Sequence, residues 1–126
     1  MIKISKTPFL PQQVIDALQT KASGSVVVHA ALVRPSSEGQ ELAAIEYEMD
    51  NGDATKELAQ IEKNIRTEWA IQDIALWRRT GKLILGDIIL VAAVSSPHRK
   101  EAFTACEKAV EQMRNMTSVK KREIYE

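Results

Sequence analysis

The sequence is short of the features that mark secreted and membrane-spanning proteins. It has one cysteine, Cys106, which excludes an internal disulfide and a zinc site built from cysteines alone. Its longest apolar run, from Ile88 to Val94, is far below the roughly 20 residues that span a bilayer. The first residues also lack the apolar stretch of a signal peptide. We therefore expect a soluble, cytoplasmic protein.

An excess of charge of either sign is also missing, and aromatic residues are few. Lys plus Arg and Asp plus Glu number 17 each, and there are two Phe, two Tyr and two Trp. Neutralising the phosphates of a nucleic acid usually needs a basic surplus, and stacking on bases needs aromatic rings. A nucleic-acid-binding α+β domain is therefore the least supported of the functions considered.

What is present suits one domain spanning residues 1–126, with 44% hydrophobic and 27% charged residues. Apolar spacing predicts three main helices, which begin at Pro11, after a cap at Asp53, and at Pro97. The last of them is expected to end at about Met116 and to bury Phe103. Strands are predicted at residues 2–4, 25–34, 43–49, 72–79, 82–94 and about 119–124. This order predicts an α+β fold with helices on a largely antiparallel sheet.

Two strands carry further expectations. The strand at 25–34 is expected to be buried on both faces, with His29 packed in it rather than binding a ligand. The loop at 35–39 separates it from a half-exposed strand, whose Glu46 and Glu48 are expected on a solvated sheet face.

The segment from Ser95 to Arg99 is the most informative local feature. Ser96 is predicted to cap the last helix, which places His98 and Arg99 in its first turn. A helix N-terminus offers free N–H groups and partial positive charge, so two basic side chains there are unfavourable unless an anion binds. The pattern predicts an anion site, and the alternative is a solvated helix start with an incidental basic pair.

Further basic residues lie where a binding site is plausible. Arg34 ends a strand and enters a loop, and Lys121 and Arg122 belong to a basic cluster near the end of the chain. Taken alone, Arg34 is better explained as a surface arginine, and the basic cluster as a solubilising tail, which is the commoner case. Cys106 and His98 are eight residues apart on one predicted helix, roughly 12 Å along its axis, which excludes a catalytic dyad. Cys106 is therefore expected in the core.

Together these segments resemble the molybdopterin synthase catalytic (large) subunit family. The fullest match runs from Ala93 to Cys106 and includes Ser-Pro-His-Arg. Weaker matches are Val33-Arg34, Ile45 to Glu48, Arg79 to Asp87, and Lys121-Arg122-Glu123. The matches keep their order and spacing from about residue 24 to residue 123.

The resemblance implies an α/β-hammerhead-like fold and a homodimer. It also implies that each protomer binds a small ubiquitin-like sulfur-carrier subunit, giving a heterotetramer. The family converts cyclic pyranopterin monophosphate (precursor Z) into molybdopterin by installing two dithiolene sulfurs, a step of molybdenum cofactor biosynthesis. The sulfur comes from a thiocarboxylate on the carrier's C-terminal glycine. No cofactor or metal ion is expected.

The same resemblance supplies roles for individual residues. The residues expected to bind the substrate are Arg34, Ser96, His98, Arg99 and Arg122. Lys121 and Arg114 are the catalytic candidates, with Arg114 at a position where the family has a lysine. Arginine keeps the positive charge but is effectively never deprotonated, so it is a poor proton shuttle. The alternative function is a non-catalytic member that binds a pterin or a sulfur carrier as a scaffold.

Overall fold

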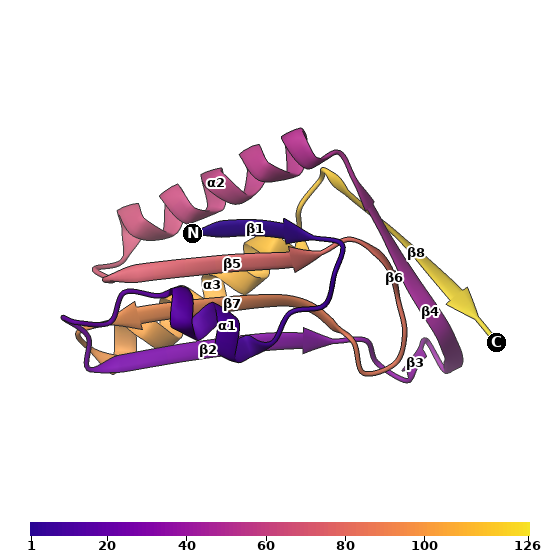
Figure 1. Ribbon diagram of the computed structural model, residues 1–126, viewed down its shortest axis with the longest axis horizontal. Coiled ribbons are helices and arrows are strands. Elements are labelled where there is room, and N and C mark those ends of the chain that lie inside the picture. The colour runs from indigo at the N-terminus through magenta and orange to yellow at the C-terminus, as the bar shows by residue number, and fades with distance from the viewer.

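The computed structural model describes all 126 residues, which form two β-sheets and three helices (Figure 1). The first sheet has the order β1-β5-β7-β2. Its strands are β1 Ile2–Ser5, β2 Ser25–Leu32, β5 Asp73–Arg79 and β7 Ile88–Ser96. β1 runs parallel to β5, and the other neighbours are antiparallel. The predicted α+β class with a largely antiparallel sheet is confirmed.

The second sheet is built around β4 (Gln40–Met49). β8 (Val119–Tyr125) and β6 (Gly81–Leu83) lie on opposite sides of β4, because Tyr47 pairs with a residue of each. The two-residue β3 (Ser36–Ser37) pairs with the first residues of β4. Figure 1 shows this smaller sheet beyond one end of the first sheet, at the right of the view.

The helices cover both faces of the first sheet. α2 (Asn51–Glu68) and α3 (Arg99–Arg114) pack on the face that presents Ile74 and Leu76, whereas α1 (Pro11–Ala17) packs on the face that presents Trp77. Because β7 is covered on both faces, its sequence is a continuous apolar run rather than an alternating one. None of the three helices is long and apolar enough to cross a membrane.

Two boundary predictions were wrong, and each has a local cause. α2 is capped by Asp50, whose Oδ1 accepts from the Asp53 N–H at 3.0 Å, rather than by Asp53 itself. The stretch at 82–94, expected to bend at Gly86 and to count as one or two strands, is two strands, because a turn at 84–87 with Gly86 at φ 88° separates β6 from β7. Ser96 belongs to β7 and does not cap α3, since it pairs with Ser25 and is completely buried.

Burial of the strand at 25–34 and of Phe103 was also predicted wrongly. β2 is an outer strand of its sheet, so it is only half-buried, His29 is exposed, and Leu32 is 52% exposed. Phe103 lies on α3 and is 59% exposed rather than part of the core. The outer edge of β2 has no neighbouring strand in the structure.

Candidate functional site

The start of α3 is held by the end of β7. His98 is the N-cap residue, with an extended backbone and no hydrogen bond from its side chain, and Arg99 is the first helical residue. Both side chains are exposed. Ser96 lies behind them in the sheet, where its hydroxyl donates to the Ala70 carbonyl at 3.2 Å. This hydroxyl is therefore used within the fold, although the residue adjoins the predicted anion site.

Gly24 fixes the position of the corner between the end of β7 and the start of α3. Its N–H donates to the Ser96 carbonyl at 3.1 Å, and a Cβ atom at this position would lie 2.8 Å from the Pro97 carbonyl oxygen. Such a contact is too short for any side chain, so only glycine allows the close approach. The approach sets the direction in which the chain enters α3 and hence the place of His98.

A second group of predicted residues lies at the opposite end of α3, around Tyr47. Lys121 pairs with Tyr47 across β4 and β8, so the two side chains project from the same face of the sheet. Arg34 follows β2, and Arg114 is the last residue of α3. The positive charges of Arg34 and Arg114 both act to lower the pKa of the Tyr47 phenol. The structure therefore brings Arg34, Arg114 and Lys121 together at one place.

The Tyr47 ring is buried and lies over a buried cation. Arg78, on β5, is 5% exposed, and its guanidinium carbon lies 5.2 Å from the centre of the Tyr47 ring. Burial raises the pKa of the Tyr47 phenol above its usual value, although the charges of Arg78, Arg114 and Arg34 oppose this rise. The phenol is therefore neutral near pH 7. Its charged neighbours are three arginines and one carboxylate, Glu123, which also pairs with Lys121 at 3.5 Å. The excess of positive charge favours a bound anion.

Arg122 does not lie with Lys121. Neighbouring residues of a strand point to opposite faces, so Arg122 projects from the other face of the second sheet. There its guanidinium contacts the Glu46 carboxylate at 3.2 Å, an exposed ion pair. The predicted substrate-binding role of Arg122 has no support from this position.

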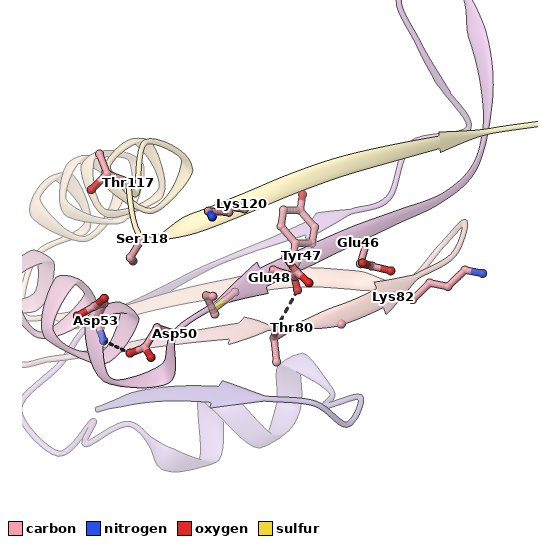
Figure 2. A pocket seen from close by; sticks show the side chains of 12 residues that line it. Glu46, Tyr47, Glu48, Asp50, Asp53, Thr80, Lys82, Thr117, Ser118 and Lys120 are labelled. Atoms are coloured by element: carbon pink, nitrogen blue, oxygen red, sulfur yellow. Dashed lines mark hydrogen bonds between the residues drawn. The ribbon is translucent and has the colours of Figure 1, made fainter.

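That other face carries the groove shown in Figure 2, with a volume of about 770 Å³. Four carboxylates and two lysines line it: Glu46, Glu48, Asp50, Asp53, Lys82 and Lys120. Excess negative charge makes this groove a poor site for a phosphate-bearing substrate. Tyr47 also lines this groove, but Lys121, which pairs with it, alternates with the groove residue Lys120 along β8. We therefore place the candidate site on the face of Lys121, around the Tyr47 phenol. No cluster of three or more His, Cys, Asp or Glu side chains is arranged to hold a metal ion.

The two groups of predicted residues are far apart within one chain. α3 has 16 residues, so its ends are about 24 Å apart. His98 and Arg99 lie at one end, and Arg114 lies at the other. A substrate of the size of a pterin cannot contact both groups in a single protomer.

Tyr47 and Arg78 are functional candidates that sequence reasoning missed. Tyr47 was part of the family resemblance, but its pattern there indicated only a strand. Arg78 had a detectable signal, because an arginine directly after the run Ile-Ala-Leu-Trp is a charge placed in a buried strand. Buried charges are rare unless they are paired or used.

The comparisons with known proteins agree with this structure. The crystal structure of molybdopterin synthase from Staphylococcus aureus aligns with a TM-score of 0.91 at 35% identity, covering 98% of this chain and 90% of that chain. A Helicobacter pylori structure, a protein–protein complex of subunits 1 and 2 of molybdopterin-converting factor, shares the fold with a TM-score of 0.77 at 15% identity, covering 98% and 88%. Fold and site thus define an α+β protein of the molybdopterin synthase type.

The sequence comparisons give the family itself. The molybdopterin synthase catalytic subunit of Bacillus subtilis is 34% identical over 98% of this chain and 79% of its own length. Residues 4–116 match the family model described as MoaE protein. The chain belongs to the MoaE protein family, and the membership predicted from the sequence is confirmed.

Proposed function

We propose that this chain, acting in the cytoplasm as a single domain of residues 1–126, is the catalytic subunit of a molybdopterin synthase. It transfers sulfur from a thiocarboxylated carrier protein to cyclic pyranopterin monophosphate. The observation that carries the proposal is the gathering of Arg34, Arg114 and Lys121 around Tyr47. The family membership supports it, since the matched relatives are molybdopterin synthase catalytic subunits.

The chemistry needs positive charge at this place. The substrate carries a phosphate, and the thiocarboxylate is an anion. After the thiocarboxylate sulfur has bonded to the pterin, water adds to the carrier's acyl carbon and negative charge develops on the acyl oxygen. The carbon–sulfur bond then breaks, which leaves sulfur on the pterin and a carboxylate on the carrier. Fixed cations stabilise such charge most where water is partly excluded. Arg34 binds the substrate, whereas Arg114 and Lys121 stabilise the developing charge. Of these, Lys121 is the residue able to exchange a proton.

The sulfur has to arrive on a partner. The only thiol of the chain, Cys106, is buried in the core and cannot act as the carrier. The partner that fits is a small ubiquitin-like protein whose C-terminal thiocarboxylate enters the cationic site. The two-subunit complex from Helicobacter pylori supports a partnership of this kind.

A second copy of the chain completes the site. Within one protomer, His98 and Arg99 lie too far from Lys121 to share its substrate. β2 begins near the start of α3, where Ser25 pairs with Ser96. Its other end lies on the side of the last turn of α3, because Ala31 pairs with Leu90, the same residue that pairs with Arg78, and Arg78 contacts Met113. Two copies that join their β2 edges in antiparallel fashion therefore place His98 and Arg99 of one beside Arg34 and Arg114 of the other.

The surface of β2 fits this pairing. Its outer backbone edge is free, and it exposes apolar side chains such as Val26 and Leu32. Free edges of this kind readily pair with another strand. Sedimentation is expected to show a species near twice 14.1 kDa, which grows further when the carrier binds.

Turnover tests the proposal. The purified chain is incubated with thiocarboxylated carrier and precursor Z, and molybdopterin is measured against a reaction without the chain and one with unthiolated carrier. Product that depends on both the chain and the thiocarboxylate is expected. A rate equal to the reaction without the chain contradicts the proposal and favours a scaffold that binds the same partners without catalysis.

A further inference from the structure

The connection between α3 and β8 joins the two catalytic candidates. Arg114 precedes it and Lys121 follows it, and only residues 115–118 lie between the helix and the strand. Asn115 and Thr117 are exposed and Ser118 is half-buried, whereas Met116 is buried in the core beneath α2 and α3. The conformation of this short link sets the separation of two cations that act on the same substrate.

One end of the connection is held by Arg78. Its Nη1 donates to the Met113 carbonyl at 3.0 Å, in the last turn of α3. The last four carbonyls of a helix have no partner within the helix, and a cation beside them also interacts favourably with the helix dipole. Because Arg78 and Met113 are both buried, this contact is shielded from water and fixes the end of the helix.

The other end is held by Glu57, on α2. Its Oε2 accepts from the Thr117 N–H at 2.9 Å, and its Oε1 accepts from the Ser118 N–H at 3.0 Å. Both hydroxyls of these residues also donate to the same carboxylate. Burial alone would raise the pKa of Glu57, but the hydrogen bonds from Ser118 and Thr117 outweigh it and lower that pKa.

The two contacts come from different elements and act on one short link. Arg78 belongs to β5 and Glu57 to α2, and the negative charge of Glu57 also acts on Arg78. The buried side chain of Met116 anchors the middle of the link, and the two polar contacts fix the backbone on either side of it.

We infer that Glu57 and Arg78 are positioning residues that hold the α3–β8 connection so that Arg114 and Lys121 face one substrate. This inference rests on the proposed function, because Arg114 and Lys121 need to be positioned only if they act together in the sulfur transfer. Neither side chain contacts the substrate. A displacement of about 1 Å in such a site costs on the order of a hundredfold in rate.

The chain offers matched controls for both residues. Glu62 also lies on α2 and is hydrogen-bonded, but its partners are Arg66 and the N-terminal amine. Arg79 adjoins Arg78, is equally buried, and donates to the Lys6 carbonyl at 3.3 Å. Neither touches the α3–β8 connection. E62Q and R79M therefore report how much activity is lost when a hydrogen-bonded carboxylate of α2 or a buried arginine of β5 is removed elsewhere.

The experiment measures kcat and the KM for precursor Z and for the thiocarboxylated carrier in E57Q, R78M and the two controls. We expect kcat to fall about tenfold or more in E57Q and R78M with KM for the carrier unchanged, and to fall less than about twofold in the controls. E57Q keeps the shape of the side chain and replaces one of the two acceptor oxygens with a donor, so it removes one of the two backbone hydrogen bonds and the negative charge without creating a cavity. Hydrogen exchange at the Thr117 and Ser118 amides is expected to accelerate in E57Q alone.

A background without Lys121 separates positioning from stability. If Glu57 acts through Lys121, then E57Q lowers the residual rate of K121A by less than twofold, whereas a stability effect lowers both backgrounds equally. Equal losses in both backgrounds, unaltered kcat, or retained amide protection in E57Q each overturn the inference while the proposed function stands. A wild-type chain that makes no product overturns both.

Discussion

At the scale of the residue, Cys106 shows where the transferred sulfur is not held. Its thiol lies between α3 and β7 and contacts the Ala92 carbonyl at 3.6 Å. Burial raises the pKa of this thiol to about 11, so it stays protonated and unreactive near pH 7. The sequence correctly predicted a core cysteine, because its spacing matches the buried face of α3.

Replacing this thiol is therefore expected to leave catalysis intact. Cys106→Ala should transfer sulfur at the wild-type rate and lose only about 1 kcal/mol of stability, the usual cost of a small change in a core. Turnover and urea denaturation measure the two effects. A rate loss above tenfold in a protein that is still folded would mean that the thiol takes part in the reaction.

Arg114 gives a second prediction at this scale. If the position acts through its charge alone, Arg114→Lys should change kcat by less than about twofold, because either cation stabilises an anion. We expect this result. A gain of tenfold, which corresponds to about 1.4 kcal/mol of transition-state stabilisation, would show that an exchangeable proton or a free amine is needed there.

The control for this experiment is Lys121. Lys121→Ala should lose most of the activity whichever role Arg114 has, because no other exchangeable amine pairs with Tyr47 across the sheet. If Lys121→Ala kept normal turnover, the catalytic roles proposed for Lys121 and Arg114 would both be wrong.

At the scale of the element, the corner between β7 and α3 depends on Gly24. Gly24→Ala brings a methyl group against the Pro97 carbonyl oxygen, so the corner must move. We expect a loss of about 1–3 kcal/mol of stability, the usual range for overpacking, together with weaker binding of the substrate. Urea denaturation and calorimetry with precursor Z measure the two effects.

Lys21→Ala is the matched control for Gly24, because Lys21 is exposed in the same connection between α1 and β2. It should change stability by less than about 0.5 kcal/mol. Equal effects of the two substitutions would show that the close approach at Gly24 does not hold the corner.

The elements also show what local sequence could and could not predict. The helix at 51–68 was evident because its apolar residues recur at helical spacing. Ser96 carried a valid capping signal, but pairing with Ser25 on a distant strand extended β7 through it. β2 resembled a buried strand because it is rich in valine and alanine, and only the strand order shows that it lies at an edge.

At the scale of the whole molecule, the sequence predicted which residues are candidates for the site, but it did not predict which of them lie together. Arg34, Arg114 and Lys121 meet because β8 pairs with β4 in one register, and that register joins residues more than 70 positions apart. Arg122 was grouped with Lys121 in the sequence, yet strand alternation sends it to the opposite face. The pairing of strands that are distant in the sequence decides these positions. A local sequence pattern does not contain that information.

The central claim is that one site uses cations from two copies of the chain. Arg99→Ala and Lys121→Ala copies are prepared separately, each nearly inactive, and then unfolded and refolded together. Random pairing gives mixed dimers in which one of two sites is intact, so the mixture should recover about a quarter of wild-type turnover. A mixture no more active than its two components would contradict the account, because it would place both residues in the same protomer's site.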